Sequence, residues 1–164
     1  MRQGSNSCAI WNRASPPGAL VLVALLLVLG SSLAPDALDA HGLQPIQVVE
    51  SFHAALEEQE KEKALELLLP DATIFEGGIA ETVEQYAAHH LMGDMAFAAA
   101  TKGELLEQSK QVVGDVAWVM TRSHRSGTFR DREIDSIGVE TVVLRHVEAG
   151  WRIAHIHWSS RRRE

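Results

Sequence analysis

The chain of 164 residues contains one cysteine, Cys8, one tyrosine, Tyr86, and only 5% aromatic residues. One cysteine cannot form an intramolecular disulfide, so an apolar core must hold the fold together. Basic residues are also few, because 15 Lys and Arg stand against 22 Asp and Glu and leave a formal net charge of −7. This charge disfavours general nucleic-acid binding. We therefore expect no nucleic-acid partner.

The longest apolar run is too short to cross a bilayer. It covers residues 19–29, whereas a membrane-spanning helix needs roughly 20 apolar residues. Arg2 and Arg13 precede this run and small residues follow it, which is the form of a secretory signal peptide. We predict a signal peptide over residues 1–40, one domain over residues 41–164, a periplasmic or secreted location, and no stable membrane insertion after processing. An uncleaved signal anchor is the alternative.

Hydrophobic periodicity predicts helices first and strands afterwards. Helical spacing covers residues 45–59, with His53 in the apolar stripe, then a short helix that Pro70 ends, and residues 81–99 with Thr82 as N-cap. A short strand is expected at residues 71–76. The period then changes to two, and turn signals separate four strands, at residues 104–113, 115–127, 133–147 and 150–160. This order predicts an α+β domain in which a curved sheet wraps a helical layer.

Alternation along these strands predicts which side chains share a face. Trp118 and Met120 share one face of the second long strand and are expected in the core. Glu140, Val142 and Leu144 share one face of the third long strand.

The predicted third helix carries an unusual polar pair. His90 and Asp94 lie one turn apart within its apolar stripe, and an imidazole oriented by a carboxylate suits a general base or a metal ligand. A hydrogen-bonded pair with a purely structural role is the alternative. Glu76 precedes two glycines at the end of the first strand, where a carboxylate would lie at a pocket mouth. The candidate catalytic residues are therefore His90, Asp94 and Glu76.

The last strand carries two histidines two residues apart. Alternation places Trp151, Ile153, His155, His157 and Ser159 on one face and Arg152, Ala154, Ile156 and Trp158 on the other. The domain requires no cofactor, but copper or zinc could bind if histidines from two elements meet. The candidate metal ligands are His89, His90, His155 and His157. Alternatively, the last two face outward in a dimer interface.

Three short motifs together resemble the SnoaL-like domains of the nuclear-transport-factor-2-like superfamily. They are the Gly-Trp-Arg-Ile and His-Ile-His-Trp-Ser segments of residues 150–159, the Pro-Asp-Ala entry to the first strand, and the Glu-Gly-Gly break after it. The resemblance covers residues 45–160. It implies a cone-shaped fold of three N-terminal helices packed on a curved, mainly antiparallel sheet, and a homodimer formed through the convex face of that sheet.

The resemblance also implies a pocket for a small, mostly apolar molecule. The side chains expected to contact this molecule are Tyr86, His89, Phe97, Trp118 and Trp158. The superfamily supports several reactions, so the resemblance assigns none of them. The function expected first is binding of the small molecule. The alternatives are an acid–base lyase or isomerase that uses His90 and Asp94, and a periplasmic copper- or zinc-binding protein.

Overall fold

The computed structural model describes residues 42–163, so the predicted signal peptide over residues 1–40 lies outside the described part of the chain. No helix within residues 42–163 combines the length and apolar character needed to span a membrane. The predicted α+β class is confirmed. The elements in chain order are α1 (Pro45–Glu57), α2 (Lys61–Glu66), β1 (Leu68–Glu76), β2 (Ile79–Thr82), α3 (Val83–His89), α4 (Leu91–Ala100), β3 (Thr101–Val113), β4 (Val116–Phe129), β5 (Arg132–Val147) and β6 (Gly150–Arg162).

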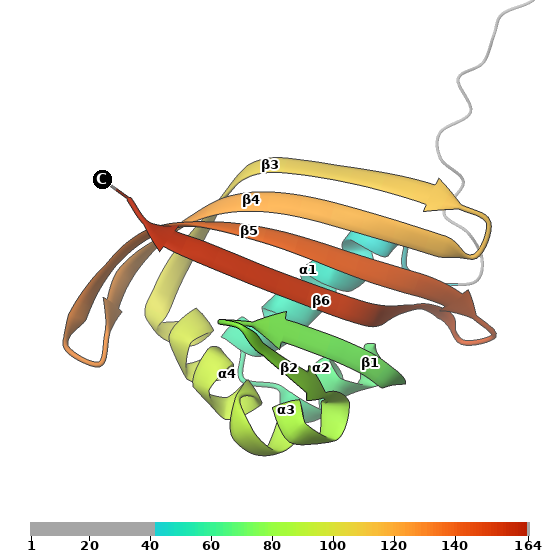
Figure 1. The fold of residues 1–164 in the computed structure, drawn as a ribbon, viewed down its shortest axis with the longest axis horizontal. Coiled ribbons are helices and arrows are strands. Elements are labelled where there is room, and N and C mark those ends of the chain that lie inside the picture. The colour runs from blue at the N-terminus through green and yellow to red at the C-terminus, as the bar shows by residue number, and fades with distance from the viewer. Residues whose placement is uncertain (1–41, 164) are drawn as a thin grey trace, which may run out of the picture. The chain divides into compact units, whose positions relative to one another are not determined.

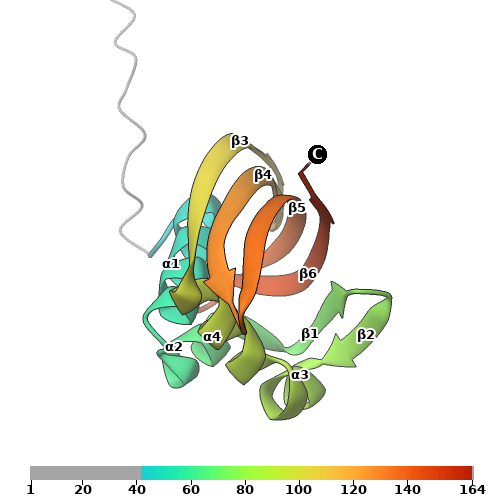
Figure 2. The same ribbon diagram turned by 90° about the vertical axis from the view of Figure 1, so that its left-hand side faces the viewer.

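The six strands form one sheet in the order β2-β1-β6-β5-β4-β3. Only β1 and β6 run parallel, and every other neighbouring pair is antiparallel. The long strands β3 to β6 bend together over α1 and α4, as Figures 1 and 2 show. The sheet therefore has an inner face toward these helices and an outer face on the other side. This arrangement confirms the predicted curved, mainly antiparallel sheet.

The core lies between the inner face of the sheet and the helices. α1 buries Val48, Val49 and Phe52 to 1% exposure, because residues at this spacing share one side of a helix. The sheet contributes fully buried side chains from three strands, which are Ala117, Val119, Val142, Leu144, Ile153 and Ile156. Burial of this apolar surface is the main source of stability in a domain without disulfides.

The predicted third helix is two helices. α3 ends at His89, and His90 joins it to α4 with φ −107° and ψ −35°. The His90 side chain turns to Glu81, with 2.6 Å between Nδ1 and Oε2. The described part therefore has four helices rather than three. The predicted N-cap is confirmed, because the Thr82 hydroxyl accepts a hydrogen bond from the Gln85 backbone N–H at 3.3 Å.

Two predictions about the faces of strands are wrong, one for β6 and one for β4. A β-bulge in β6 leaves Ala154 without a partner, because Val143 pairs with His155 while Leu144 pairs with Ile153. The inner face therefore changes from Ile153 to Ile156, and His155 does not share a face with Trp151. β2 was not expected at all, because four residues are too few to show a period.

The expected core face of β4 is the second error. Ala117 and Val119 are fully buried, whereas Met120 is 41% exposed. Trp118 lies on the same outer face as Met120. Alternation correctly placed Ala117 and Val119 on one face of β4 and Trp118 and Met120 on the other. The larger apolar side chains, however, lie on the outer face.

Candidate functional site

A cavity of about 590 Å³ lies between the inner face of the sheet and the helices α1 and α4. Its apolar walls include Val49 and Leu56 from α1, Phe97 from α4, and Trp158 from β6. Its polar lining comes from both helices and from five strands. The volume is within the range of small-molecule sites in proteins.

One row of paired residues crosses the inner face and lines this cavity. Glu76 pairs with Trp158, Trp158 with Glu140, Glu140 with Thr121, and Thr121 with Gln108. All five residues line the cavity. Neighbouring strands lie about 4.8 Å apart, so the backbones at Glu76 and Glu140 are separated by about 10 Å. The Trp158 indole therefore stands between two carboxyl groups.

The first carboxyl end of the row combines Glu76 of β1 with Asp94 of α4. Glu76 lines the cavity and is exposed, whereas the Oδ2 atom of Asp94 is buried and has no hydrogen-bond partner in the described part of the chain. Partial burial raises the pKa of Glu76, and the negative charge of Asp94 raises it further. Burial also raises the pKa of Asp94, although the Tyr86 hydroxyl and His90 oppose this shift. Both carboxyl groups therefore hold a proton to higher pH than usual.

The second carboxyl end is centred on Glu140, which is only 8% exposed. Its Oε1 accepts a hydrogen bond from Trp158 Nε1 at 2.5 Å, and its Oε2 lies 3.1 Å from His53 Nε2. Burial raises the pKa of Glu140, but the hydrogen bond and the positive charge of His53, the Trp158 hydrogen bond and the charge of Arg125 outweigh burial, so the pKa is lowered. Glu140 is therefore a buried, ionised carboxylate at neutral pH.

Arg125 is the arginine that lines the cavity. Its guanidinium donates a hydrogen bond to the Thr101 hydroxyl at 3.0 Å and lies 3.6 Å from a Glu57 oxygen. It also lies 5.7 Å from the centre of the Phe97 ring. These contacts fix its orientation beside the Glu140 end of the row.

The structure separates the three candidate catalytic residues. Glu76 and Asp94 line the cavity together. His90 is outside its lining, with a side chain 44% exposed and bonded to Glu81. That hydrogen bond raises the pKa of His90. His90 lies close enough to influence both carboxyl groups electrostatically, but the predicted inward His90–Asp94 pair is not formed.

Only some of the residues expected to contact the ligand line the cavity. Phe97 and Trp158 line the cavity. Tyr86 is fully buried behind Trp158, with 6.3 Å between the ring centres. His89 is exposed on α3, and Trp118 lies on the outer face of the sheet, away from the cavity lining. The placement of Trp118 in the pocket is therefore wrong, because the inner face of β4 carries Thr121 instead.

The four candidate metal ligands do not form one cluster. His89 and His90 lie near Glu81 on the helical side. His155 Nδ1 lies 2.8 Å from the Thr73 hydroxyl, and the Phe75 ring packs between His155 and His157. Within residues 42–163 no three His, Cys, Asp or Glu side chains are arranged to hold a metal ion. Copper or zinc binding stays a prediction from the sequence.

Sequence reasoning did not assign His53 and Glu140 to the site. A signal for both was present, because each is a polar residue within a stripe of core residues, His53 on α1 and Glu140 beside Val142 and Leu144. The contact between them joins residues 87 positions apart. Only the folded arrangement of α1 over β5 brings them together.

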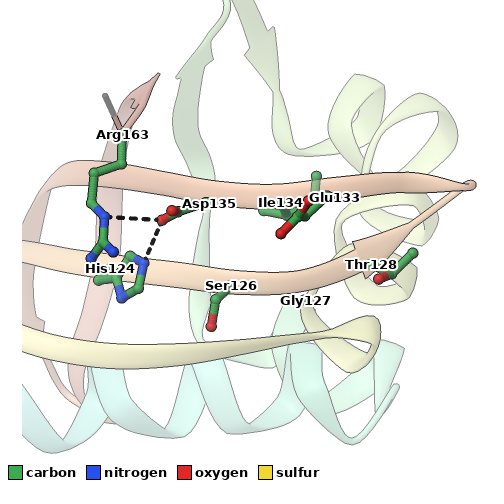
Figure 3. A pocket seen from close by; sticks show the side chains of 8 residues that line it. All are labelled: His124, Ser126, Gly127, Thr128, Glu133, Ile134, Asp135 and Arg163. Carbon is green, nitrogen blue, oxygen red and sulfur yellow. Dashed lines mark hydrogen bonds and ion pairs between the residues drawn. The ribbon is translucent and has the colours of Figure 1, made fainter.

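A second hollow, of about 570 Å³, lies over the ends of β4 and β5 (Figure 3). His124 Nε2 lies 2.7 Å from Asp135, and its Nδ1 lies 3.6 Å from Glu104. Arg163 also reaches Asp135, at 3.3 Å. Both ring nitrogens of His124 thus face separate carboxylates. His124, Asp135 and Arg163 of this hollow pair with one another, so the inner cavity is the better candidate site.

Comparisons with known proteins identify a family and several solved structures with the same fold. The family model of the SnoaL-like domain matches residues 46–162. A solved structure named "putative ketosteroid isomerase", from Shewanella frigidimarina NCIMB 400, is 35% identical in sequence. The match covers 69% of this chain and 92% of that chain, with a TM-score of 0.67.

Two further solved structures share the fold at lower identity. The CaMKII hub of S. rosetta is 19% identical, with 73% of this chain and 99% of that chain covered and a TM-score of 0.62. A "putative dehydratase from the NTF2-like family" of Streptomyces avermitilis is 18% identical, with 69% and 90% covered and a TM-score of 0.57. None of the curated proteins matches the chain. The chain belongs to the SnoaL-like domain family, within the nuclear-transport-factor-2-like fold.

Proposed function

We propose that this protein is an acid–base enzyme that binds a small, mostly apolar carbonyl compound in the inner cavity and moves a proton on it. The observation that carries the proposal is the placement of Asp94 and Glu76 in one cavity with raised pKa values. Ionisable groups perturbed in this way are typical of catalytic sites. A protein that only bound an apolar ligand would gain nothing from two such carboxyl groups.

The two carboxyl groups have different roles. His90 favours the ionised form of both carboxyl groups, whereas the Tyr86 hydroxyl favours that of Asp94 alone, so we assign the negative charge to Asp94. The resulting negative charge raises the pKa of Glu76. Asp94 is therefore the proton acceptor, and Glu76 is the proton donor.

The 35% identical structure from Shewanella frigidimarina supports a carbonyl substrate through its name, "putative ketosteroid isomerase". The proposal differs from the alternative drawn from the sequence in one residue. His90 acts on the charges of the pair from outside the cavity, while Asp94 and Glu76 contact the substrate.

The test measures proton abstraction directly. 1-Tetralone, a bicyclic ketone, is incubated with the protein in D2O, and exchange of the protons next to its carbonyl is followed by NMR. We expect exchange above the buffer rate. Asp94→Asn should lower that rate by about 100-fold, the effect of losing one general base.

Glu148→Gln is the matched control, because Glu148 is an exposed carboxylate in the turn between β5 and β6. It should exchange 1-tetralone at the wild-type rate. Exchange by the wild-type protein no faster than in buffer, or full exchange by Asp94→Asn, would overturn the proposal.

We also propose a homodimer formed through the outer face of the sheet. Large apolar side chains on this face are exposed, among them Phe75 (42%), Met120 (41%) and Val116 (39%). An apolar sheet face of this kind is typical of a protein interface. Met120→Asp should convert a dimer to a monomer in analytical ultracentrifugation. A wild-type protein that sediments as a monomer at all concentrations tested would contradict the dimer.

Export is a further proposal, supported by the apolar run at residues 19–29 after Arg2 and Arg13. The full chain expressed in a Gram-negative bacterium should appear in the periplasm, shortened at its N-terminus. Recovery of the uncut chain from the cytoplasm would contradict export.

A further inference from the structure

Arg125 of β4 lines the cavity but has no part in the proposed function. Its side chain is 21% exposed, so the guanidinium is largely withdrawn from water. A guanidinium carries five N–H donors. Within residues 42–163 it makes one hydrogen bond, from Nη1 to the Thr101 hydroxyl at 3.0 Å. The other donors are therefore available to a ligand in the cavity.

The neighbouring carboxylates leave the charge of this guanidinium incompletely paired. Glu57, the last residue of α1, lies 3.6 Å from Nη2 and its side chain is 49% exposed. This distance is too long for a hydrogen bond, and water weakens the attraction at such a site. The Glu140 carboxylate is engaged by Trp158 and His53, and Arg125 acts on it through its charge. An anion that reaches the guanidinium directly can displace the Glu57 contact.

Small residues border the guanidinium and leave room for a ligand group. Ser136 of β5 pairs with Arg125, and Ser123 lies two residues earlier on the same face of β4. Both line the cavity, and their hydroxyls are hydrogen-bond donors. On the other side Arg125 pairs with Gly103 of β3, where an added Cβ would lie 3.4 Å from Nη2. The guanidinium therefore lies over a residue without a side chain and beside two hydroxyl groups.

Phe97 connects this end of the cavity with the proton acceptor. Asp94 and Phe97 are three residues apart on α4, so their β-carbons are separated by about 5–6 Å. The Arg125 guanidinium lies 5.7 Å from the centre of the Phe97 ring. A flat molecule that packs against Phe97 can therefore reach Asp94 with one end and Arg125 with the other.

We propose that Arg125 binds a carboxylate of the substrate, and that the substrate class is a ketone with a flat apolar body and a carboxylate remote from the reacting carbon. Arginine binds both oxygens of a carboxylate through two parallel N–H groups, and the Ser123 and Ser136 hydroxyls supply further donors. This inference rests on the proposed function, because Asp94 and Glu76 perform the proton transfer. Arg125 is a binding residue and takes no part in that transfer.

The test compares two ketones that differ in one group. 1-Tetralone-6-carboxylate contains the reacting ketone of 1-tetralone and carries a carboxylate on the other ring. Isothermal titration calorimetry measures the binding of each compound, and exchange in D2O gives KM and kcat. We expect the wild-type protein to bind the carboxylate at least about 10-fold more tightly than 1-tetralone, the effect of hydrogen bonds to a charged group.

Two variants should change this preference in opposite directions. Arg125→Gln should abolish it, so that the two ketones bind with similar affinity, and the change for the carboxylate should appear in KM rather than in kcat. Glu57→Gln should strengthen it, because Glu57 competes with the ligand for Nη2. A residue with a purely structural role would not tighten binding when it is replaced. Since Glu57 is half-exposed, this variant decides the question if Arg125→Gln fails to fold.

Arg122→Gln is the matched control. Arg122 lies on the outer face of β4, 46% exposed, and donates a hydrogen bond to Glu107. This variant should bind and exchange both ketones as the wild-type protein does. Thermal melting of each variant confirms that it is folded.

Three results would overturn the inference. They are equal wild-type affinity for the two ketones, an undiminished preference in Arg125→Gln, and weaker binding of the carboxylate by Glu57→Gln. Calorimetry separates this failure from failure of the proposed function, because binding is measured without exchange. Exchange of 1-tetralone without a preference for the carboxylate overturns the role of Arg125 alone. A preference that depends on Arg125, without exchange of either ketone, overturns the proposed function, and absence of both overturns both.

Discussion

Asp94→Asn should stabilise the protein while it removes activity. The Asp94 Oδ2 atom is buried without a hydrogen-bond partner in the described part of the chain. Burial raises the pKa of Asp94 above its ordinary value of 3.8. The folded protein therefore holds this proton more tightly than the unfolded chain. The stabilisation that this bound proton gives is complete below pH 3.8 and is lost as pH rises through the folded-state pKa of Asp94.

The size of the effect follows from proton linkage. One proton bound more tightly in the folded state changes the free energy of unfolding by at most about 1.4 kcal/mol per pH unit. Asparagine does not titrate, so the advantage of Asp94→Asn over wild type should grow as pH rises from 4. At pH 8 we expect about 1 kcal/mol, allowing for the partial exposure of the side chain. This corresponds to about 4 °C in Tm for a domain of this size.

The assay is urea unfolding of wild type and Asp94→Asn at unit steps from pH 4 to pH 8. The control is Glu148→Gln, an exposed carboxylate whose replacement should change stability by less than about 0.5 kcal/mol at every pH. A difference between Asp94→Asn and wild type that stays constant or shrinks as pH rises would refute the reasoning. Such a result would mean that the ionised Asp94 carboxylate does not destabilise the folded protein. Asp94 would then not be a residue kept for catalysis at the expense of stability.

Three further variants test single contacts. Tyr86→Phe should lower the free energy of unfolding at pH 8 by about 1 kcal/mol, because it removes the hydroxyl that favours the ionised form of Asp94. An unchanged or raised urea midpoint would show instead that this hydroxyl does not bond Asp94. Thr82→Ala should cost about 1 kcal/mol, since it removes the cap of α3; an unchanged urea midpoint would mean that the cap contributes nothing. His90→Ala should destabilise more at pH 6 than at pH 9. The Glu81 hydrogen bond raises the pKa of His90, so its stabilisation is complete below the unfolded value of about 6.5 and disappears as pH rises through the folded pKa. Thermal melting at the two pH values decides this, and an equal loss at both would contradict it.

Local sequence pattern was sufficient for most of the secondary structure. A period of 3.6 gave α1 and a period of two gave β3 to β6, because each period reflects which side of an element is buried. The same logic failed where the backbone departs from regular geometry. The turn at His90 preserves the helical stripe on both sides, and the bulge at Ala154 exchanges the faces of β6 without a signal in composition.

The sequence by itself therefore determined the α+β class, the limits of the long elements, and the presence of Glu76 and Asp94 as site candidates. The tertiary structure decided which charged groups share the cavity. It joined Glu76 to Asp94 and His53 to Glu140, and it placed His90 and Trp118 outside the cavity lining. The physical reason is that a repeating pattern shows on which side of its own helix or strand a residue lies. A site, in contrast, depends on distances between different elements. Those distances are set by sheet register and helix packing, which no single segment encodes.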